Sequence, residues 1–431
     1  MGNRKNRVTR RQFLAGATLA AATGSAAVFG SPPSALTGTV IGNKSEQGRG
    51  TLVVVFLRGA ADGLSMVPPH GEDAYYRLRP TLALPRPNEK RESPSARSLD
   101  LDGFFGLHPA LAPLLPIYQK GEMAIVHAVG SDDNTRSHFE AMAQMERGVA
   151  LGDATASGWL ARHLGTMETD NVSPLRAIAV SETMPDSLRG SQSAVSLRTL
   201  SDFRLNAPEP IRNAAMLSSL NSLYSGEKSS LHHAGAETLK ALDAIRALKP
   251  ETYLPSPGVE YKDTDLGNGL RQVACLMKGR VGMEVACLEM TGWDTHVAQG
   301  RDTGYMSLRL RELSEGTAAF YSDLGAQRKD VTVLVMTEFG RRAYENYGLG
   351  TDHGRASAMF VLGGGVKGGK VYGDWPTLAQ DKMEGSGDLR VTTDYRDVLA
   401  EILQARLCNE RVAEVFPGWK GKTLGLINPA A

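Results

Sequence analysis

The stretch Thr51-Leu52-Val53-Val54-Val55-Phe56-Leu57 decides the fold of this chain. Its residues are almost all apolar, many of them β-branched, and they lack the polar–apolar alternation of a half-buried strand. A continuous apolar run of this length is typical of a strand buried on both faces, as in a parallel sheet. We therefore expect residues 51–57 to form a central strand of an α/β domain.

Further apolar runs along the chain repeat this pattern. We expect strands at 123–129, 285–290, 331–336 and 359–362. Helical periodicity between and after these runs predicts helices at 110–119, 137–147, 266–278, 307–324 and 394–405. Strands that alternate with helices predict an α/β sheet with right-handed crossovers.

The middle of the chain, about 165–260, differs from the rest. It is polar, rich in Ser, Asn and Pro, and it has few long apolar runs. We interpret it as an insertion that caps the sheet, with helices near 210–225 and 234–247. The expected organisation is therefore one domain over 51–425 that carries this polar insertion.

The first 30 residues have the features of an export signal. Five basic side chains and no acidic one accompany an apolar, small-residue stretch from Phe13 to Phe29. Thr9-Arg10-Arg11-Gln12-Phe13-Leu14 has the paired arginines and following Phe-Leu of the twin-arginine type. We predict a twin-arginine signal at 1–30, a linker at 31–50, and export by the twin-arginine translocase to the periplasm or the outside. An uncleaved anchor and a disordered basic tail are the alternatives.

Composition narrows the classes of function. The chain has 48 basic and 47 acidic residues, and five of the basic ones lie in the expected signal, so the remainder is slightly acidic. Such a surface offers no basic field for nucleic acid. The three cysteines show no CxxC spacing, so we expect a fold that does not depend on disulfides. No stretch is long and apolar enough to predict a stable membrane span.

Polar residues follow the expected strands at the edge where open parallel sheets bind ligands. These strand-end segments supply six candidate metal ligands: Asp62, Asp294, His296, Glu338, Asp352 and His353. Carboxylate and imidazole groups bind divalent ions such as Zn, Mn, Mg or Ca. Taken singly, a strand-end Asp is more often a helix cap or turn former. Isolated histidines are more often structural, and we interpret six of them in that way: His70, His108, His127, His163, His232 and His233.

Ser137 stands between a strand-end loop and the expected helix. Its structural role would be an N-cap, with Glu140 completing a capping box. Its functional role would be a metal-activated nucleophile at a helix N-terminus that holds a phosphate or sulfate oxyanion. Three arginines in the same segments are suited either to bind an oxyanion or to form surface ion pairs: Arg58, Arg136 and Arg341.

Together these segments resemble the DUF1501 family, a large group of exported bacterial proteins of unknown function. The resemblance rests on motifs distributed along the chain: FLRGAADGL (56–64), SHFEAMAQMERG (137–148), GWDTH (292–296), TEFGRR (337–342), TDHG (351–354) and TTDYRDVLAEIL (392–403). The family is similar to the alkaline phosphatase and sulfatase superfamily. This similarity implies a three-layer α/β/α fold with metal ligands at the ends of the strands.

The resemblance also implies roles for individual residues. Asp62, Asp294, His296 and His353 would match metal ligands, and Ser137 or Thr135 would match the nucleophile. Arg341 is a further catalytic candidate because of its place in a strand-end segment and not because of the resemblance. Glu338-Phe339 stands where active members carry an Asp-His pair, and a phenyl ring cannot bind a metal.

The expected function is therefore a metal-dependent hydrolase of phosphate or sulfate esters, acting on a small-molecule or carbohydrate ester outside the cytoplasm. The alternative is a non-catalytic binding or assembly protein on a degenerate hydrolase scaffold. Phe339 and the polar middle region favour this alternative.

Overall fold

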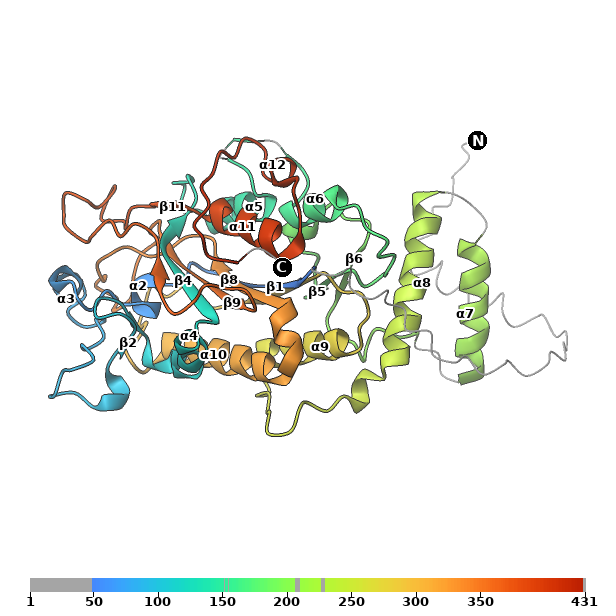
Figure 1. The fold of residues 1–431 in the computed structure, drawn as a ribbon, viewed down its shortest axis with the longest axis horizontal. Coiled ribbons are helices and arrows are strands. Elements are labelled where there is room, and N and C mark those ends of the chain that lie inside the picture. The colour runs from blue at the N-terminus through green and yellow to red at the C-terminus, as the bar shows by residue number, and fades with distance from the viewer. Residues whose placement is uncertain (1–48, 151, 154, 206–209, 226–228, 429–431) are drawn as a thin grey trace, which may run out of the picture. The chain divides into compact units, whose positions relative to one another are not determined.

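The computed structural model describes residues 49–428 apart from 151, 154, 206–209 and 226–228 (Figure 1). The predicted signal at 1–30 lies outside the described residues, as does the predicted linker except for residues 49 and 50. The described residues contain a nine-stranded sheet with the order β10-β4-β9-β8-β1-β7-β5-β6, in which β11 also pairs with β4.

The sheet is mostly parallel, as predicted. Its strands are β1 (Thr51–Leu57), β4 (Met123–Gly130), β5 (Ala177–Val180), β6 (Ala194–Leu197), β7 (Val285–Met290), β8 (Val331–Thr337), β9 (Ser357–Gly363), β10 (Val371–Tyr372) and β11 (Thr393–Asp394). Only β9 runs antiparallel to its neighbours, β4 and β8. A separate antiparallel pair is formed by β2 (Leu99–Asp100) and β3 (Gly106–Leu107). All five strands expected from the sequence are confirmed.

The central strand β1 lies between β7 and β8 and pairs with both in parallel. Its side chains alternate between the two faces of the sheet. Val53 and Val55 belong to one hydrophobic cluster, and Val54 and Phe56 belong to the other. Burial of such a side chain contributes about 1.5–3 kcal/mol. The continuous apolar run is therefore explained by burial on both faces.

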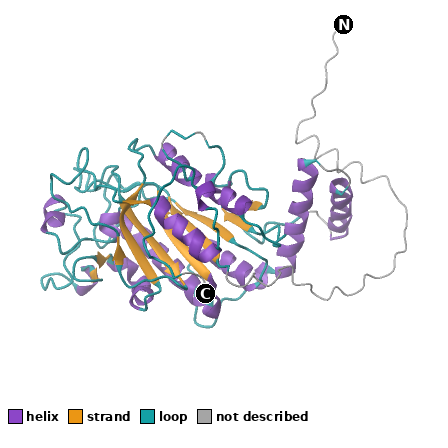
Figure 2. Ribbon diagram, turned by 45° about the horizontal axis from the view of Figure 1, so that its top comes forward, coloured by secondary structure: helices purple, strands orange, loops and turns teal. Residues whose placement is uncertain are grey.

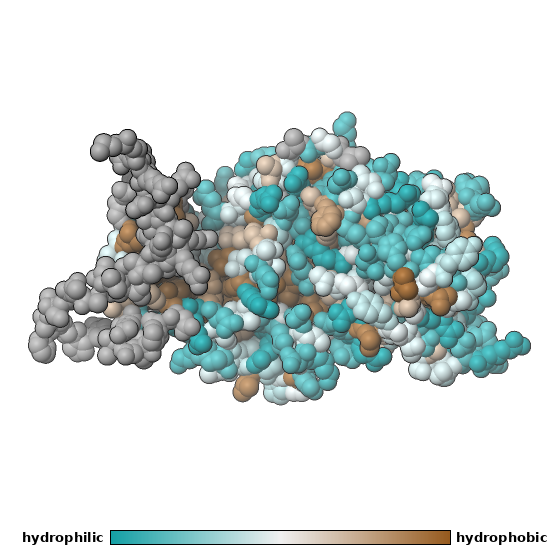
Figure 3. Space-filling model, turned by 180° about the vertical axis from the view of Figure 1, so that it is seen from behind, coloured by the Kyte–Doolittle hydropathy of each residue, from teal (hydrophilic) through white to brown (hydrophobic). Residues whose placement is uncertain are grey.

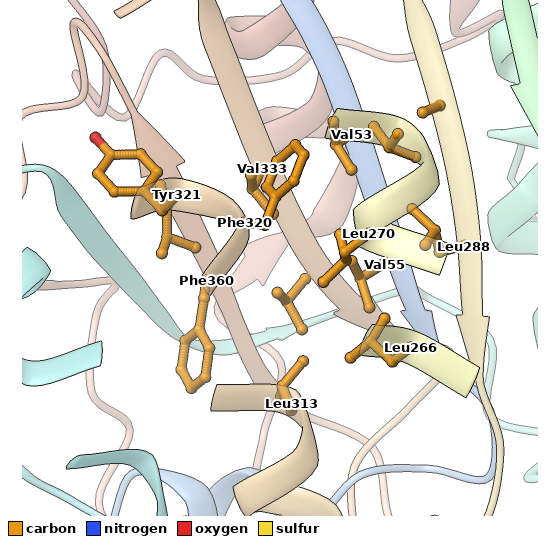
Figure 4. Close-up of a cluster of buried hydrophobic side chains, with 14 of the residues drawn as sticks. Val53, Val55, Leu266, Leu270, Leu288, Leu313, Phe320, Tyr321, Val333 and Phe360 are labelled. Atoms are coloured by element: carbon orange, nitrogen blue, oxygen red, sulfur yellow. The ribbon is translucent and has the colours of Figure 1, made fainter. Parts of the chain in front are cut away.

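Helices cover both faces of the sheet (Figures 1 and 2). On one face α9 (Asp265–Lys278) and α10 (Tyr305–Asp323) pack Leu270 and Phe320 against β1 and β8, as Figure 4 shows. On the other face lie α5 (His138–Arg147), α6 (Trp159–Thr166), α11 (Tyr395–Leu407) and α12 (Val412–Val415). The domain is therefore a mixed α/β structure around a central sheet.

Shorter helices connect these elements. They are α2 (Gly63–Met66), α3 (Asp73–Leu78), α4 (Leu115–Gln119) and the 3₁₀ segments η1 (Pro94–Ala96), η2 (Pro109–Leu114), η3 (Asp186–Leu188), η4 (Pro250–Thr252) and η5 (Gly325–Asp330). The helix expected at 110–119 is in fact η2 followed by α4. Pro113 lies inside η2 and Pro116 lies in the first turn of α4. A proline lacks the N–H that a continuous α-helix needs, which explains the division.

The region 165–260 divides into two parts. Its first part supplies β5 and β6, which extend the main sheet in parallel from β7, so the sheet reaches into the region that we interpreted as an insertion. Each of these strands has four residues, too few for a periodic signal. The second part contains the two expected helices, α7 (Pro210–Tyr224) and α8 (Ser230–Leu248). Leu239 is buried, and Ile245 of α8 belongs to the same hydrophobic cluster as Val53.

The described surface is mixed in character. Figure 3 shows one face on which hydrophilic side chains predominate over hydrophobic ones. Across the part of the chain that the structure describes, no helix combines the length and the apolar content that a bilayer crossing requires.

Candidate metal centre

Segments at one edge of the sheet bring three imidazoles and a carboxylate together. His138 begins α5 after β4, Asp294 and His296 follow β7, and His353 precedes the antiparallel β9. Because β9 runs in the opposite direction, its beginning lies at the same edge as the ends of its neighbours. His138, Asp294 and His353 each offer a ligand atom, and these atoms all lie within 4.8 Å of one another.

His296 adds a third imidazole to this group. Its Nε2 lies 2.9 Å from Nε2 of His353 and 3.1 Å from Oδ1 of Asp294. Nε2 of His353 is also 3.1 Å from Oδ1 of Asp294, and Nε2 of His138 is 3.6 Å from the same oxygen. Three Nε2 atoms therefore surround one carboxylate oxygen.

The other nitrogen of each ring is hydrogen-bonded outside this group. The pairs are His138 Nδ1 with Glu338 Oε1 (2.8 Å), His296 Nδ1 with Asp352 Oδ1 (3.2 Å) and His353 Nδ1 with the carbonyl of Arg136 (3.0 Å). Carbonyls and ionised carboxylates only accept hydrogen bonds, which assigns the hydrogen to Nδ1 in each ring. In a neutral imidazole Nε2 then presents a lone pair.

These lone pairs lack donors within the described part of the chain. Nε2 of His138 is buried there without a hydrogen-bond partner. Nε2 of His296 and Nε2 of His353 lie 2.9 Å apart, a contact that is favourable only when a proton or a metal ion lies between the two nitrogens. Adjacent ligands held about 2.0–2.2 Å from one metal ion lie about 3 Å apart, close to these separations. Metal-binding histidines also typically donate their other N–H to a carboxylate or a carbonyl. The residues present thus fit a metal ion.

The surroundings favour the ligand forms of Asp294 and His353 but not that of His138. Burial alone would raise the pKa of Asp294, but the hydrogen bond and charge of Arg341, helped by His353 and His296, lower it to about 2. Burial and the nearby charges of Arg341 and His138 lower the pKa of His353, although contact with Asp294 acts in the opposite direction. The hydrogen bond with Glu338 raises the pKa of His138 despite partial burial, so a proton and a metal ion would compete for this ring.

Glu338 lies beneath the site. Its carboxylate is fully buried, and Oε1 accepts from the backbone N–H of Gly59 at 2.8 Å as well as bonding His138. Oε2 accepts from the hydroxyl of Thr337 at 2.9 Å. The ring of Phe339 stacks on His138 with centroids 5.0 Å apart. Glu338 and Phe339 therefore orient His138 from two sides.

The structure gives Asp62 a different set of partners. Its two oxygens accept from the guanidinium of Arg79 at 2.6 and 3.0 Å, and both side chains are buried. The hydroxyl of Ser65 and the amide of Gln299 donate to Oδ2 at 2.7 and 2.8 Å. Asp62 therefore does not join the histidines, and these contacts indicate a structural role.

The three expected anion-binding arginines are held by acceptors of the protein itself. Arg58 pairs with Glu146 and Glu289, and Arg136 pairs with Asp388. Arg341 is buried and donates to four backbone carbonyls, those of Gly59, Ala60, Trp293 and Thr351, and to Oδ1 of Asp294 at 2.6 Å. Arg341 thus fixes the position of Asp294 beside the histidines.

Ser137 occupies the N-cap of α5, but its side chain makes no capping hydrogen bond. The expected capping box with Glu140 is therefore absent, and the hydroxyl is not used to hold the helix. Thr135 lies nearby in the chain, where its hydroxyl bonds Asp133 at 3.2 Å and accepts from the N–H of Ser137 at 3.3 Å. Asp352 accepts from Asn346 at 2.9 Å in addition to orienting His296.

His138 is the site residue that the sequence analysis missed. It ends the segment after the second expected strand, but we interpreted it only as the start of a helix. Its position in the sequence could have identified it, because His138 follows β4 at the same edge of the sheet at which His296 follows β7. Four of the histidines interpreted as structural, His70, His108, His127 and His163, are indeed buried and hydrogen-bonded within the protein.

A mostly parallel sheet with converging imidazoles at its ligand-binding edge defines an α/β protein with a candidate metal centre. The chain belongs to the DUF1501 family, described as proteins of unknown function, whose model matches residues 49–411. Among solved structures it is similar to the phosphonate monoester hydrolase of Agrobacterium radiobacter, with 11% identity, coverage of 86% of this chain and 79% of that chain, and a TM-score of 0.34. A comparison with curated proteins gave no match.

Proposed function

We propose that this protein is a metal-dependent hydrolase of phosphate or sulfate esters on an alkaline phosphatase-like α/β/α scaffold. The observation that carries the proposal is the convergence of three histidine Nε2 atoms on Asp294, each ring being fixed through Nδ1. His138 would supply an imidazole beside Phe339, which cannot bind a metal itself.

The donor set points to a particular kind of ion. Three imidazole nitrogens and one carboxylate oxygen suit Zn²⁺ or Mn²⁺ better than Mg²⁺ or Ca²⁺, which prefer oxygen ligands. The side chain of Asp294 is 48% exposed, so water and substrate have access to the group. A bound metal ion would lower the pKa of a water molecule at the site and would polarise the ester oxygen.

Residues of the chain would supply the remaining chemistry. Ser137 is the candidate nucleophile, since its hydroxyl is not used for capping at the N-terminus of the ten-residue helix α5. Backbone N–H groups at a helix N-terminus attract oxyanions such as phosphate or sulfate. In the proposed reaction the Ser137 oxygen bonds to phosphorus or sulfur, the bond to the alcohol breaks, and the alcohol takes the serine proton. Water then releases the group from Ser137. Thr135 and Arg341 would act as positioning residues.

Metal analysis of the purified full chain tests the proposal. We expect about one equivalent of Zn or Mn per chain, which His296→Ala and His353→Ala should each remove. His233→Ala is the matched control, because this exposed histidine lies on α8. A chain without any divalent ion, unaffected by His296→Ala, would contradict the proposal. Turnover of 4-nitrophenyl phosphate and 4-nitrophenyl sulfate, and its loss in Ser137→Ala, would then test the reaction.

The second candidate is a binding or assembly protein that keeps the scaffold without catalysis. The observation that favours it is the engagement of Arg58, Arg136 and Arg341 by carboxylates of the protein itself. Metal-loaded protein that turns over neither kind of ester, and whose physiological role survives Ser137→Ala, would establish this candidate.

We also propose that the chain is exported by the twin-arginine translocase to the periplasm or the cell exterior. The proposal rests on the Arg10-Arg11 pair before Phe13-Leu14. A chain with both Arg10→Lys and Arg11→Lys should stay in the cytoplasm with its N-terminus intact. Unchanged export of this variant would contradict the proposal.

A further inference from the structure

A cavity of about 670 Å³ lies beside α3, outside the metal centre. None of the four converging side chains, His138, Asp294, His296 and His353, is among the residues that line it. Its volume is within the range of about 300–1,000 Å³ of pockets that bind small molecules. The cavity is therefore large enough for a ligand of its own.

Part of its wall is apolar. Ala74 and Leu378 belong to one hydrophobic cluster, and the partly buried Leu78 and Met383 pack against it. An apolar part of this kind can hold the body of a small ligand, while polar groups of the same wall fix its orientation.

An aromatic ring and a glycine loop complete the wall. A Cβ at Gly387, whose φ is +101°, would lie 2.2 Å from the ring of Tyr344, so only glycine permits this close approach. The hydroxyl of Tyr344 donates to the carbonyl of Ser386. These two contacts therefore fix the position of the Tyr344 ring at the edge of the cavity.

Arg77 is the charged residue of the lining, which contains no carboxylate. Its side chain is exposed, and within the described residues it forms no ion pair. Arg79, two residues further on, is instead buried against Asp62. The guanidinium of Arg77 therefore remains available to an anion at the cavity, with geometry suited to a carboxylate, sulfate or phosphate group.

We propose that this cavity binds a small amphipathic anion. The aromatic or aliphatic body would pack on Leu78, Met383 and the Tyr344 ring, and the carboxylate, sulfate, sulfonate or phosphate group would pair with Arg77. This binding does not depend on the metal centre or on catalysis.

The cavity wall is nevertheless connected to the metal centre. The guanidinium of Arg342 donates to the Tyr344 hydroxyl at 3.2 Å and lies 3.5 Å from Asp352, which orients His296. A ligand in the cavity would therefore lie next to residues that hold the metal centre, without occupying that centre.

Isothermal titration of the purified full chain with 2-naphthalenesulfonate tests the proposal, with and without added zinc. We expect one saturable site in both conditions. Arg77→Gln should weaken binding about tenfold or more, because a charge-assisted hydrogen bond is lost. Ala379→Phe, at an exposed residue of the lining, should fill the cavity and remove binding. The neutral 2-naphthalenemethanol should bind wild type and Arg77→Gln equally and should not bind Ala379→Phe.

The controls separate this proposal from the proposed function. Arg91→Gln removes an equally exposed arginine outside the lining and should leave binding unchanged. Thermal unfolding shows that each variant is folded. Absence of saturable binding to wild type at millimolar ligand, or full binding by either Arg77→Gln or Ala379→Phe, would overturn the proposal. Metal content is measured separately, so its loss would bear on the hydrolase and not on this cavity.

Discussion

Asp62 and Asp294 follow neighbouring parallel strands, β1 and β7, and each carboxylate lies beside a buried arginine. The Asp62 side chain is 1% exposed, and both its oxygens are satisfied by Arg79, Ser65 and Gln299. The Asp294 side chain is 48% exposed, and apart from Arg341 its neighbours are lone pairs of histidines. Asp62 and Asp294 thus have the same residue type and equivalent places after neighbouring strands, but their hydrogen-bond partners differ.

This difference shows how a structural carboxylate and a candidate ligand can be told apart. A buried carboxylate with donors on both oxygens has no capacity left for a ligand and stabilises the fold. A partly exposed carboxylate whose other neighbours are imidazole nitrogens can instead share a metal ion with them. The predictions below change one partner at a time on each side of this comparison.

The largest effect is expected from Asp62→Ala. This change leaves the guanidinium of Arg79 buried without its carboxylate, so we expect a loss of about 3–5 kcal/mol in the free energy of unfolding. Arg79 would keep only its hydrogen bonds to the carbonyls of Arg342 and Ala343 and to Ser65. Urea unfolding of the metal-free protein measures the change.

Asp294→Ala is the matched control for this experiment. It should cost about 1 kcal/mol or less in the absence of metal, because the carboxylate is partly exposed and Arg341 keeps four carbonyl acceptors. Equal destabilisation by Asp62→Ala and Asp294→Ala would break the comparison.

The stabilisation by Asp62 should also depend on pH in a defined direction. Burial alone would raise the pKa of Asp62, but the charge and hydrogen bonds of Arg79, with Ser65 and Gln299, lower it below the ordinary value. The stabilisation is therefore fully present above the pKa of the unfolded carboxyl, about 4, and is lost as the pH falls through the lower folded value. The difference in unfolding free energy between wild type and Asp62→Asn should shrink below about pH 4. A difference that grows in acid would contradict the assignment.

A smaller effect is expected at the metal centre from Glu338→Gln. This change weakens the hydrogen bond that fixes His138, and loss of such a partner typically lowers metal affinity about 10–100-fold. Competition with a chelator measures the affinity for zinc. Asp100→Asn is the matched control, since it alters a histidine–carboxylate pair, His70 with Asp100, away from the centre. Equal affinity of wild type and Glu338→Gln would contradict the role of the Glu338 carboxylate in fixing His138 as a ligand.

The contrast between these sites also shows what the sequence could predict. Continuous apolar runs identified the five main strands, so the edge of the sheet that carries the polar residues was predictable. The partners that give each residue its role were not, because they are distant along the chain. Gln299 is separated from Asp62 by 237 positions and Glu338 from His138 by 200. The four-residue strands β5 and β6 were missed because pairing with β7, and not a periodic pattern, defines them.

The smallest effect is expected from Ser137→Ala, and it extends the comparison from carboxylates to helix caps. Ser137 makes no capping hydrogen bond to α5, whereas Thr264 at the N-cap of α9 accepts from the N–H of Gly267 at 3.1 Å. Removing a functioning cap costs about 1 kcal/mol. Thr264→Ala should therefore destabilise the protein by about that amount, and Ser137→Ala should change the unfolding free energy by less than about 0.5 kcal/mol. A loss as large as that of Thr264→Ala would mean that the Ser137 hydroxyl is used by the helix. An unchanged unfolding free energy in Ser137→Ala would agree with the absence of a capping hydrogen bond from Ser137 to α5.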